Sequence, residues 1–160
     1  MKADQDLAFA SASELSELIS SKRVSPVELT ELFLERIQST NPKLNAFLTV
    51  TVDMAMKSAR AAEAAVVRGD ALGPLHGIPT SIKDLVPTKG IRTTRGSLTL
   101  EDWIPEEDDA VVERIKGAGA IILGKTNTPE FGISATTENK LGDDCRNPWN
   151  PERVAGGSSG

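Results

Sequence analysis

The sequence predicts an α/β fold, and three observations lead to that prediction. Residues 54–67 form an alanine-rich run with the composition of a helix. Residues 110–116 have helical character and are followed, after two glycines, by the apolar run 120–123, which is typical of a buried strand. A further apolar stretch, 78–82, follows a turn-rich segment. Helices followed by short apolar strands indicate an α/β domain.

The length of 160 residues fits one domain, because a chain of about 150 residues buries roughly 70% of its unfolded surface. We expect a single domain over residues 1–160. The composition changes near residue 71, so we expect a helical N-terminal region over 1–70 and the start of the α/β core over 71–160.

Charge and residue counts narrow the function classes. The chain has 18 basic and 23 acidic residues, which disfavours nucleic acid and anionic membranes as partners. Its one cysteine, Cys145, and one histidine, His76, cannot build a disulfide framework or a metal cluster. Residues 1–6 are polar, and no apolar run approaches the ~18 residues that span a bilayer. We therefore expect a soluble, cytoplasmic protein without a metal site.

The N-terminal region shows local helix signals. Apolar spacing predicts a short amphipathic helix from Ser13 that ends near Ser21. A second helix is predicted to begin at Pro26, after the N-cap Ser25, and to stop at Asn41-Pro42. Residues 44–52 are expected to be extended, and the helix over 54–67 is expected to close at Gly69.

The second half of the chain has shorter elements. The strand over 78–82 leads to Lys83, and residues 89–103 are predicted to be irregular. The six acids between 101 and 109 favour the solvated start of the helix 110–116 over a cation site, because carboxylates stabilise a helix N-terminus. Residues 127–132 suggest a short helical turn, and 146–151 form a two-proline segment that leads to the serine loop. We expect about three strands in all.

Two segments carry the candidate chemistry. Residues 156–160 place two serines between glycines, which gives a substrate close access to the backbone. Lys83 could accept a proton if burial lowered its pKa. From the residues alone, Lys83 could equally form a salt bridge with Asp84 or another acid, and Ser158 could belong to an ordinary glycine-serine turn.

A third pattern is misleading. Residues 119–126 fit the phosphate-loop consensus, in which a glycine-rich loop binds nucleotide phosphates. The central residues 120–123 are themselves the predicted strand, whereas a phosphate loop follows a strand. The sequence therefore argues against a nucleotide site.

A series of motifs gives the sequence a recognisable family pattern. In chain order these are Leu75-His76-Gly77-Ile78-Pro79 with Ile82-Lys83-Asp84, Gly90-Ile91-Arg92-Thr93-Thr94, residues 119–127 with Glu130-Phe131, Thr137-Glu138-Asn139, Arg146-Asn147-Pro148-Trp149, and residues 156–160. The chain resembles the N-terminal portion of the amidase signature family, the Ser-Ser-Lys amidases that include transamidosome A-subunit-like proteins. The resemblance implies an α/β domain with a mixed central sheet flanked by helices.

The resemblance also implies an activity and site residues. The implied reaction is hydrolysis or transfer at the C–N bond of a small-molecule carboxamide, without a cofactor. Lys83 corresponds to the catalytic lysine, and Ser158 to a bridging serine held by a cis peptide. Ser134, Thr137 and Ser159 are expected near the substrate. His76 is not expected to act as a base, since the family does not use one. A homo-oligomer or a partner subunit remains open.

The chain departs from the family pattern in two places. Residues 142–145 interrupt the approach to Arg146, which puts the local loop contacts in doubt. The family's nucleophilic serine lies in a glycine-rich loop downstream of Ser158, and no residue here matches it. We therefore expect an incomplete domain, truncated before the nucleophile, and no amide hydrolysis by these 160 residues. The alternatives are a non-catalytic fragment and a partner-binding module on the same scaffold.

Overall fold

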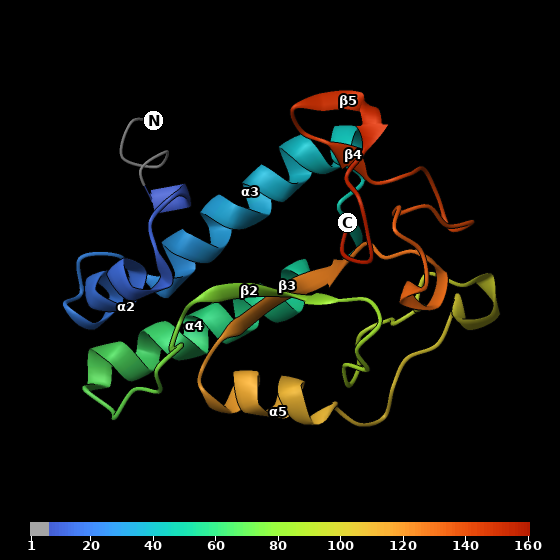
Figure 1. Cartoon of the computed structure of the whole chain (residues 1–160). Coiled ribbons are helices and arrows are strands. Elements are labelled where there is room, and N and C mark those ends of the chain that lie inside the picture. Colours follow the sequence, from blue (N-terminus) through green and yellow to red (C-terminus); the bar gives the residue numbers. More distant parts are fainter. Residues whose placement is uncertain (1–6) are drawn as a thin grey trace. The chain divides into compact units, whose positions relative to one another are not determined.

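The computed structural model describes residues 7–160, so the polar residues 1–6 lie outside the described part. Figure 1 gives the order of the elements. They are α2 (Ala12–Ser20), α3 (Pro26–Leu44), β1 (Phe47–Val50), α4 (Val52–Arg68), β2 (Pro79–Lys83), the 3₁₀ turn η1 (Leu98–Leu100), α5 (Ala110–Gly117), β3 (Ile121–Thr126), the 3₁₀ turn η2 (Glu130–Gly132), β4 (Arg146–Asn147) and β5 (Asn150–Val154). The predicted α/β class is confirmed.

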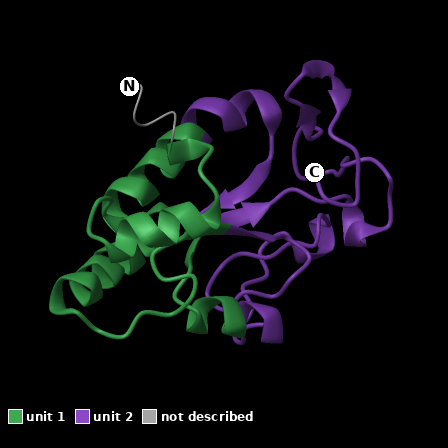
Figure 2. Cartoon of the chain, turned by 60° about the vertical axis from the view of Figure 1, so that its left-hand side comes forward, with its two compact units in different colours: residues 1–36, 51–80, 113–123 green, residues 37–50, 81–112, 124–160 purple. Residues whose placement is uncertain are grey.

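The chain divides into two compact units, coloured separately in Figure 2. Unit 1 comprises residues 1–36, 51–80 and 113–123, and unit 2 comprises 37–50, 81–112 and 124–160. The expected single domain with its change of character near residue 71 stays a prediction. Within the described residues, no helix combines the length and the hydropathy needed to cross a membrane.

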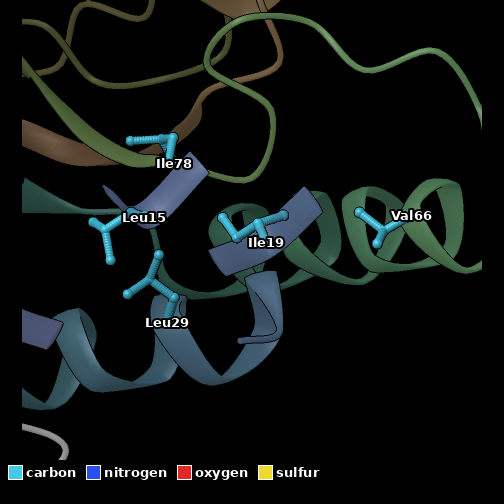
Figure 3. Packing of buried hydrophobic residues seen from close by; sticks show 5 residues of the cluster. All are labelled: Leu15, Ile19, Leu29, Val66 and Ile78. Atoms are coloured by element: carbon cyan, nitrogen blue, oxygen red, sulfur yellow. The ribbon is translucent and has the colours of Figure 1, made fainter. Parts of the chain in front are cut away.

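The core of unit 1 is a cluster of aliphatic side chains from three helices and the segment before β2. Figure 3 shows its five buried members, which are Leu15, Ile19, Leu29, Val66 and Ile78. Ser11 and Glu14 form a capping box at the start of α2, which directs Leu15 and Ile19 inward. The spacing of these residues on each helix produces one apolar face.

The start of α3 and the end of α4 are each determined by a neighbouring capping residue. The Ser25 hydroxyl accepts from the Val27 amide at 2.9 Å, directly before α3 begins at Pro26. At the other end of the helical region, α4 closes at Gly69, whose φ of 78° is a left-handed conformation that glycine adopts without strain.

The predicted end of the second helix is wrong. α3 continues through Pro42 to Leu44, and the Asn45 amide donates to the Asn41 carbonyl at 2.8 Å. Pro42 has no amide hydrogen, so the helix lacks one backbone hydrogen bond there but still continues for two more residues. The Asn41 side chain pairs with both backbone groups of Phe47, at 2.8 and 3.1 Å, and leads the chain into β1.

The three-stranded sheet has the order β1-β3-β2. β1 and β3 are antiparallel, with Phe47 opposite Thr126 and Val50 opposite Gly124. A Cβ on Gly124 would collide with the Thr49 carbonyl, which explains a glycine inside a strand. The Ile121 amide donates to the Ile78 carbonyl and the Asp84 amide to the Thr126 carbonyl, so partners advance together and the sheet is mixed.

The sequence prediction missed a second sheet. β4 and β5 form an antiparallel hairpin in which Arg146 pairs with Val154 and Asn147 with Asn150. The two-proline segment 146–151 therefore lies within this hairpin. Pro151 lies within β5, which is tolerated because a two-stranded sheet leaves one side of each strand without a hydrogen-bonding partner. β3 also continues past Leu123 to Thr126.

Candidate active site

Lys83 and Ser158, which are 75 residues apart in the sequence, meet in unit 2. Lys83 is the last residue of β2, and its Nζ donates to the Ser158 Oγ at 2.9 Å. Both residues are half-buried. Partial removal of the ammonium from water lowers the pKa of Lys83, because burial disfavours the charged form. A lysine in this state is closer to a proton acceptor than an ordinary surface lysine.

The serine loop, residues 156–160, is fixed by several backbone contacts. The Gly157–Ser158 peptide bond is cis. The Thr128 hydroxyl lies 3.4 Å from the Ser158 carbonyl. A Cβ on Gly157 would lie 2.6 Å from the Ser134 carbonyl oxygen, so only glycine allows the loop to pack this closely against residues 134–136.

The other predicted site residues differ in their exposure and in their hydrogen bonds. Thr137 is fully buried, and its hydroxyl donates to the Gly156 carbonyl at 2.6 Å. Ser134 is exposed and accepts a hydrogen bond from the Thr136 amide at 3.2 Å, while Ser159 is exposed beside Ser158. The 134–137 segment thus lies against the serine loop. The substrate-binding roles of these residues stay predictions.

Sequence reasoning did not single out a buried charged cluster directly after Lys83. Asp84 and Lys125 are both completely buried, and Asp84 Oδ1 lies 3.9 Å from Lys125 Nζ. Lys125, not Lys83, is therefore the lysine that this ion pair contains. The available signal was a lysine at the end of an apolar strand, beside the glycine at which two strands approach closely.

Burial and charge act in opposite directions on Asp84. Burial raises the pKa of this carboxyl, and hydrogen bonds from Thr94 together with the positive charges of Lys125 and Arg92 counteract part of that rise. The Lys125 ammonium donates to oxygen atoms of the segment 86–93. The lysine of a phosphate loop would instead reach toward nucleotide phosphates. Residues 121–126 are a strand, which excludes a phosphate loop there.

Three remaining sequence features have structural explanations. His76 Nε2 lies 2.9 Å from the Ala62 carbonyl within unit 1. The Asp109 carboxylate accepts from the Val111 amide at 3.0 Å, so this end of the acidic run caps α5. Across residues 7–160, no group of three or more His, Cys, Asp or Glu side chains could hold a metal ion.

The segment 142–145, which differs from the family pattern, ends in the buried residue Cys145. The Cys145 amide donates to the Thr137 carbonyl at 3.0 Å, and its carbonyl accepts from the Ala155 amide at 2.9 Å. Burial raises the pKa of the Cys145 thiol, which favours the unreactive protonated form. This cysteine therefore connects the 134–137 segment to the strand that precedes the serine loop.

Comparison with known proteins places the chain in a family. A family model described as Amidase matches residues 28–160, so the chain belongs to the amidase family. The predicted membership of the amidase signature family is confirmed. The chain is 46% identical over 155 residues to the A subunit of the glutamyl-tRNA(Gln) amidotransferase of Moorella thermoacetica, covering 97% of this chain and 32% of the relative. It is 48% identical over 151 residues to the protein of the same name from an Azoarcus species, covering 94% and 31%.

Solved structures agree with this placement. A bacterial aryl acylamidase of the amidase signature family superposes with a TM-score of 0.88 at 35% identity, covering 94% of this chain and 32% of that one. The peptide amidase from Stenotrophomonas maltophilia gives a TM-score of 0.86 at 31% identity, covering 95% and 32%. The chain spans about a third of the length of the curated relatives it matches.

Proposed function

We propose that this chain is the N-terminal part of an enzyme that cleaves carboxamide C–N bonds with a Ser-Ser-Lys triad. Lys83 is the proton acceptor, Ser158 is the relay, and the nucleophilic serine belongs to a segment that follows residue 160 in the complete protein. The hydrogen bond of 2.9 Å between Lys83 Nζ and Ser158 Oγ carries the proposal. The lowered pKa of Lys83 supports the same assignment.

The proposed proton path uses the two functions of a serine hydroxyl. Ser158 Oγ accepts the proton of the nucleophile while it donates its own proton to a neutral Lys83 Nζ. The nucleophile oxygen then forms a bond to the amide carbon, and the C–N bond breaks as the proton returns to the leaving nitrogen. Water, or another acceptor, takes the acyl group and releases the serine. No metal or organic cofactor enters this sequence of steps.

The three predicted substrate residues receive two different roles in this proposal. Ser134 is exposed beside the serine loop, so its hydroxyl is available to contact the acyl group of the substrate. Thr137 already donates to the Gly156 carbonyl, so we assign it to holding the loop. Ser159 is exposed on the same loop and completes the candidate substrate contacts.

The names of the relatives favour a second form of the function, in which nitrogen is transferred to an acceptor. Their name describes one part of an amidotransferase that acts on glutamyl-tRNA(Gln), and the identity to this chain is 46%. We propose that the complete protein acts on a primary carboxamide and that, in a multisubunit assembly, the released nitrogen is handed to an acceptor. Such an assembly would be cytoplasmic, as the sequence composition predicts.

We expect the pH dependence of the complete protein to reveal the neutral lysine. The value of kcat/KM for a simple primary amide, measured as ammonia release, should rise with pH because protonated Lys83 cannot accept a proton. The rise should be centred below the ordinary pKa of lysine, since burial favours the neutral form. Lys140→Ala, at an exposed site, serves as the control and should leave the profile unchanged. A rate that falls as pH rises through this range would exclude Lys83 as the base.

A further inference from the structure

We propose that Lys125 is a positioning residue for catalysis: with Asp84, it fixes the chain segment from which Lys83 reaches Ser158. This inference rests on the proposed function of Lys83. Lys125 lies on β3, and its ammonium donates to oxygen atoms of the segment 86–93 and faces the carboxylate of Asp84. Its effect on the reaction would therefore pass through the residues around Asp84.

The surroundings of Lys125 are built to hold a cation. Its side chain is 0% exposed, and Nζ donates to the Val86 carbonyl at 2.5 Å, to Thr88 Oγ1 at 2.9 Å and to Thr93 Oγ1 at 2.8 Å. An ammonium has three N–H donors, and each of them can be directed at one of these acceptors. A buried charge is tolerated only with such compensation. The segment 86–93, which begins three residues after Lys83, thus folds around the ammonium.

Asp84 follows Lys83 directly in the sequence, and its carboxylate faces this cation. Asp84 Oδ2 accepts from the Thr94 amide at 2.8 Å and from Thr94 Oγ1 at 2.5 Å. Asp84 Oδ1 has no hydrogen-bond partner in the described part of the chain, and it faces Lys125 Nζ at 3.9 Å. The positive charge of Lys125 is therefore the compensation that this oxygen receives at close range.

The backbone of Asp84 is fixed as well. Its amide donates to the Thr126 carbonyl at 3.0 Å, and its carbonyl accepts from the Arg95 amide at 3.1 Å. Thr126 follows Lys125 directly on β3. The Asp84 amide is held by the residue next to Lys125, and its carboxylate by Thr94, the residue next to the Lys125 acceptor Thr93. A disturbance at Lys125 would therefore move the end of β2, where Lys83 lies.

The charge balance makes this arrangement sensitive to loss of Lys125. Burial raises the pKa of Asp84 and disfavours its charged form. The positive charge of Lys125 acts in the other direction and stabilises the carboxylate. Removing one partner of a buried pair leaves an uncompensated charge, whereas removing both partners does not. A small displacement is enough to matter, because a misplacement of about 1 Å in an active site can cost about 100-fold in rate.

The test measures kcat and KM for a primary amide in the complete protein. Lys125→Met should lower kcat about 100-fold while KM stays within about twofold. Adding Asp84→Asn to Lys125→Met should restore kcat about tenfold, because no unpaired charge stays buried and the amide oxygen still accepts from Thr94. The matched control is Lys140→Met at an exposed site, which should behave like the unchanged protein. Circular dichroism melting checks that each variant is folded.

The outcomes separate this inference from the proposed function. If Lys83→Ala is inactive but Lys125→Met keeps its kcat, the positioning role is overturned and the function stands. An active Lys83→Ala overturns the proposed function itself. If Lys125→Met does not fold, Thr93→Val removes one acceptor of the ammonium and should still lower kcat at constant KM. An unchanged kcat in that variant, or a loss in Lys125→Met that Asp84→Asn does not relieve, would also overturn the inference.

Discussion

Lys83→Ala is expected to lower the kcat of the complete protein about 10⁴-fold or more, since members of a catalytic triad act as a unit. In the proposed mechanism this lysine accepts the proton that leaves the nucleophile. Its Nζ lies 2.9 Å from Ser158 Oγ, and alanine leaves that hydroxyl without the acceptor. The KM for the amide should change much less than kcat, because Lys83 acts on the proton and not on the bound substrate.

The arginine variant separates a proton acceptor from a fixed positive charge. A guanidinium stays protonated at all accessible pH values, so Lys83→Arg should be as inactive as Lys83→Ala. The measurement is kcat by ammonia release, with melting temperatures to show that the variants are folded. Lys140→Arg, at an exposed position, is the matched control. An active Lys83→Arg would contradict the proton-acceptor role.

Ser158→Ala should have the second largest effect, a loss of about 100-fold or more in kcat. The hydroxyl has to accept and donate in the same step, and the alanine side chain can do neither. The Gly157 and Thr137 contacts that hold the loop involve backbone atoms of the loop, so the variant should fold normally. Ser58→Ala, on the exposed face of α4, is the control and should leave kcat unchanged.

The Ser158 variant also discriminates between a relay and a nucleophile. A relay that is lost leaves the nucleophile in place, so slow turnover and slow acylation should persist. Loss of the nucleophile removes covalent chemistry at the serine altogether. Complete absence of an acyl-enzyme in Ser158→Ala, observed by mass spectrometry under conditions that trap it in the unchanged protein, would argue against the relay.

Local signals account for most of the elements that the sequence predicted. The N-cap at Ser25 and the left-handed glycine at Gly69 depend only on neighbouring residues, so they are readable without the fold. The continuation of α3 through Pro42 and the β4-β5 hairpin were missed. Both segments contain a proline, which the sequence alone indicates as the end of a helix or strand. Strand pairing also depends on the partner strand, which local sequence signals do not reveal.

The candidate site could be predicted only in part. Lys83 and Ser158 were predicted from a family motif series, not from periodicity, because nothing local indicates that residues 75 positions apart meet. The burial of Lys125 could not be predicted for a similar reason. Its acceptors come from Val86, Thr88 and Thr93, and a threonine in a loop is ordinarily exposed. Only the folded segment 86–93 turns these residues into a binding site for a buried ammonium.

The most direct test of the account is to locate the nucleophile chemically. The purified 160-residue chain and a longer protein that contains it are each treated with a serine-reactive fluorophosphonate, and the labelled peptide is identified by mass spectrometry. The account predicts stoichiometric labelling of the longer protein at a serine beyond Gly160, dependent on Lys83, and neither labelling nor amide turnover in the 160-residue chain. Stoichiometric labelling of Ser158 in either protein, with turnover abolished by Ser158→Ala, would contradict it.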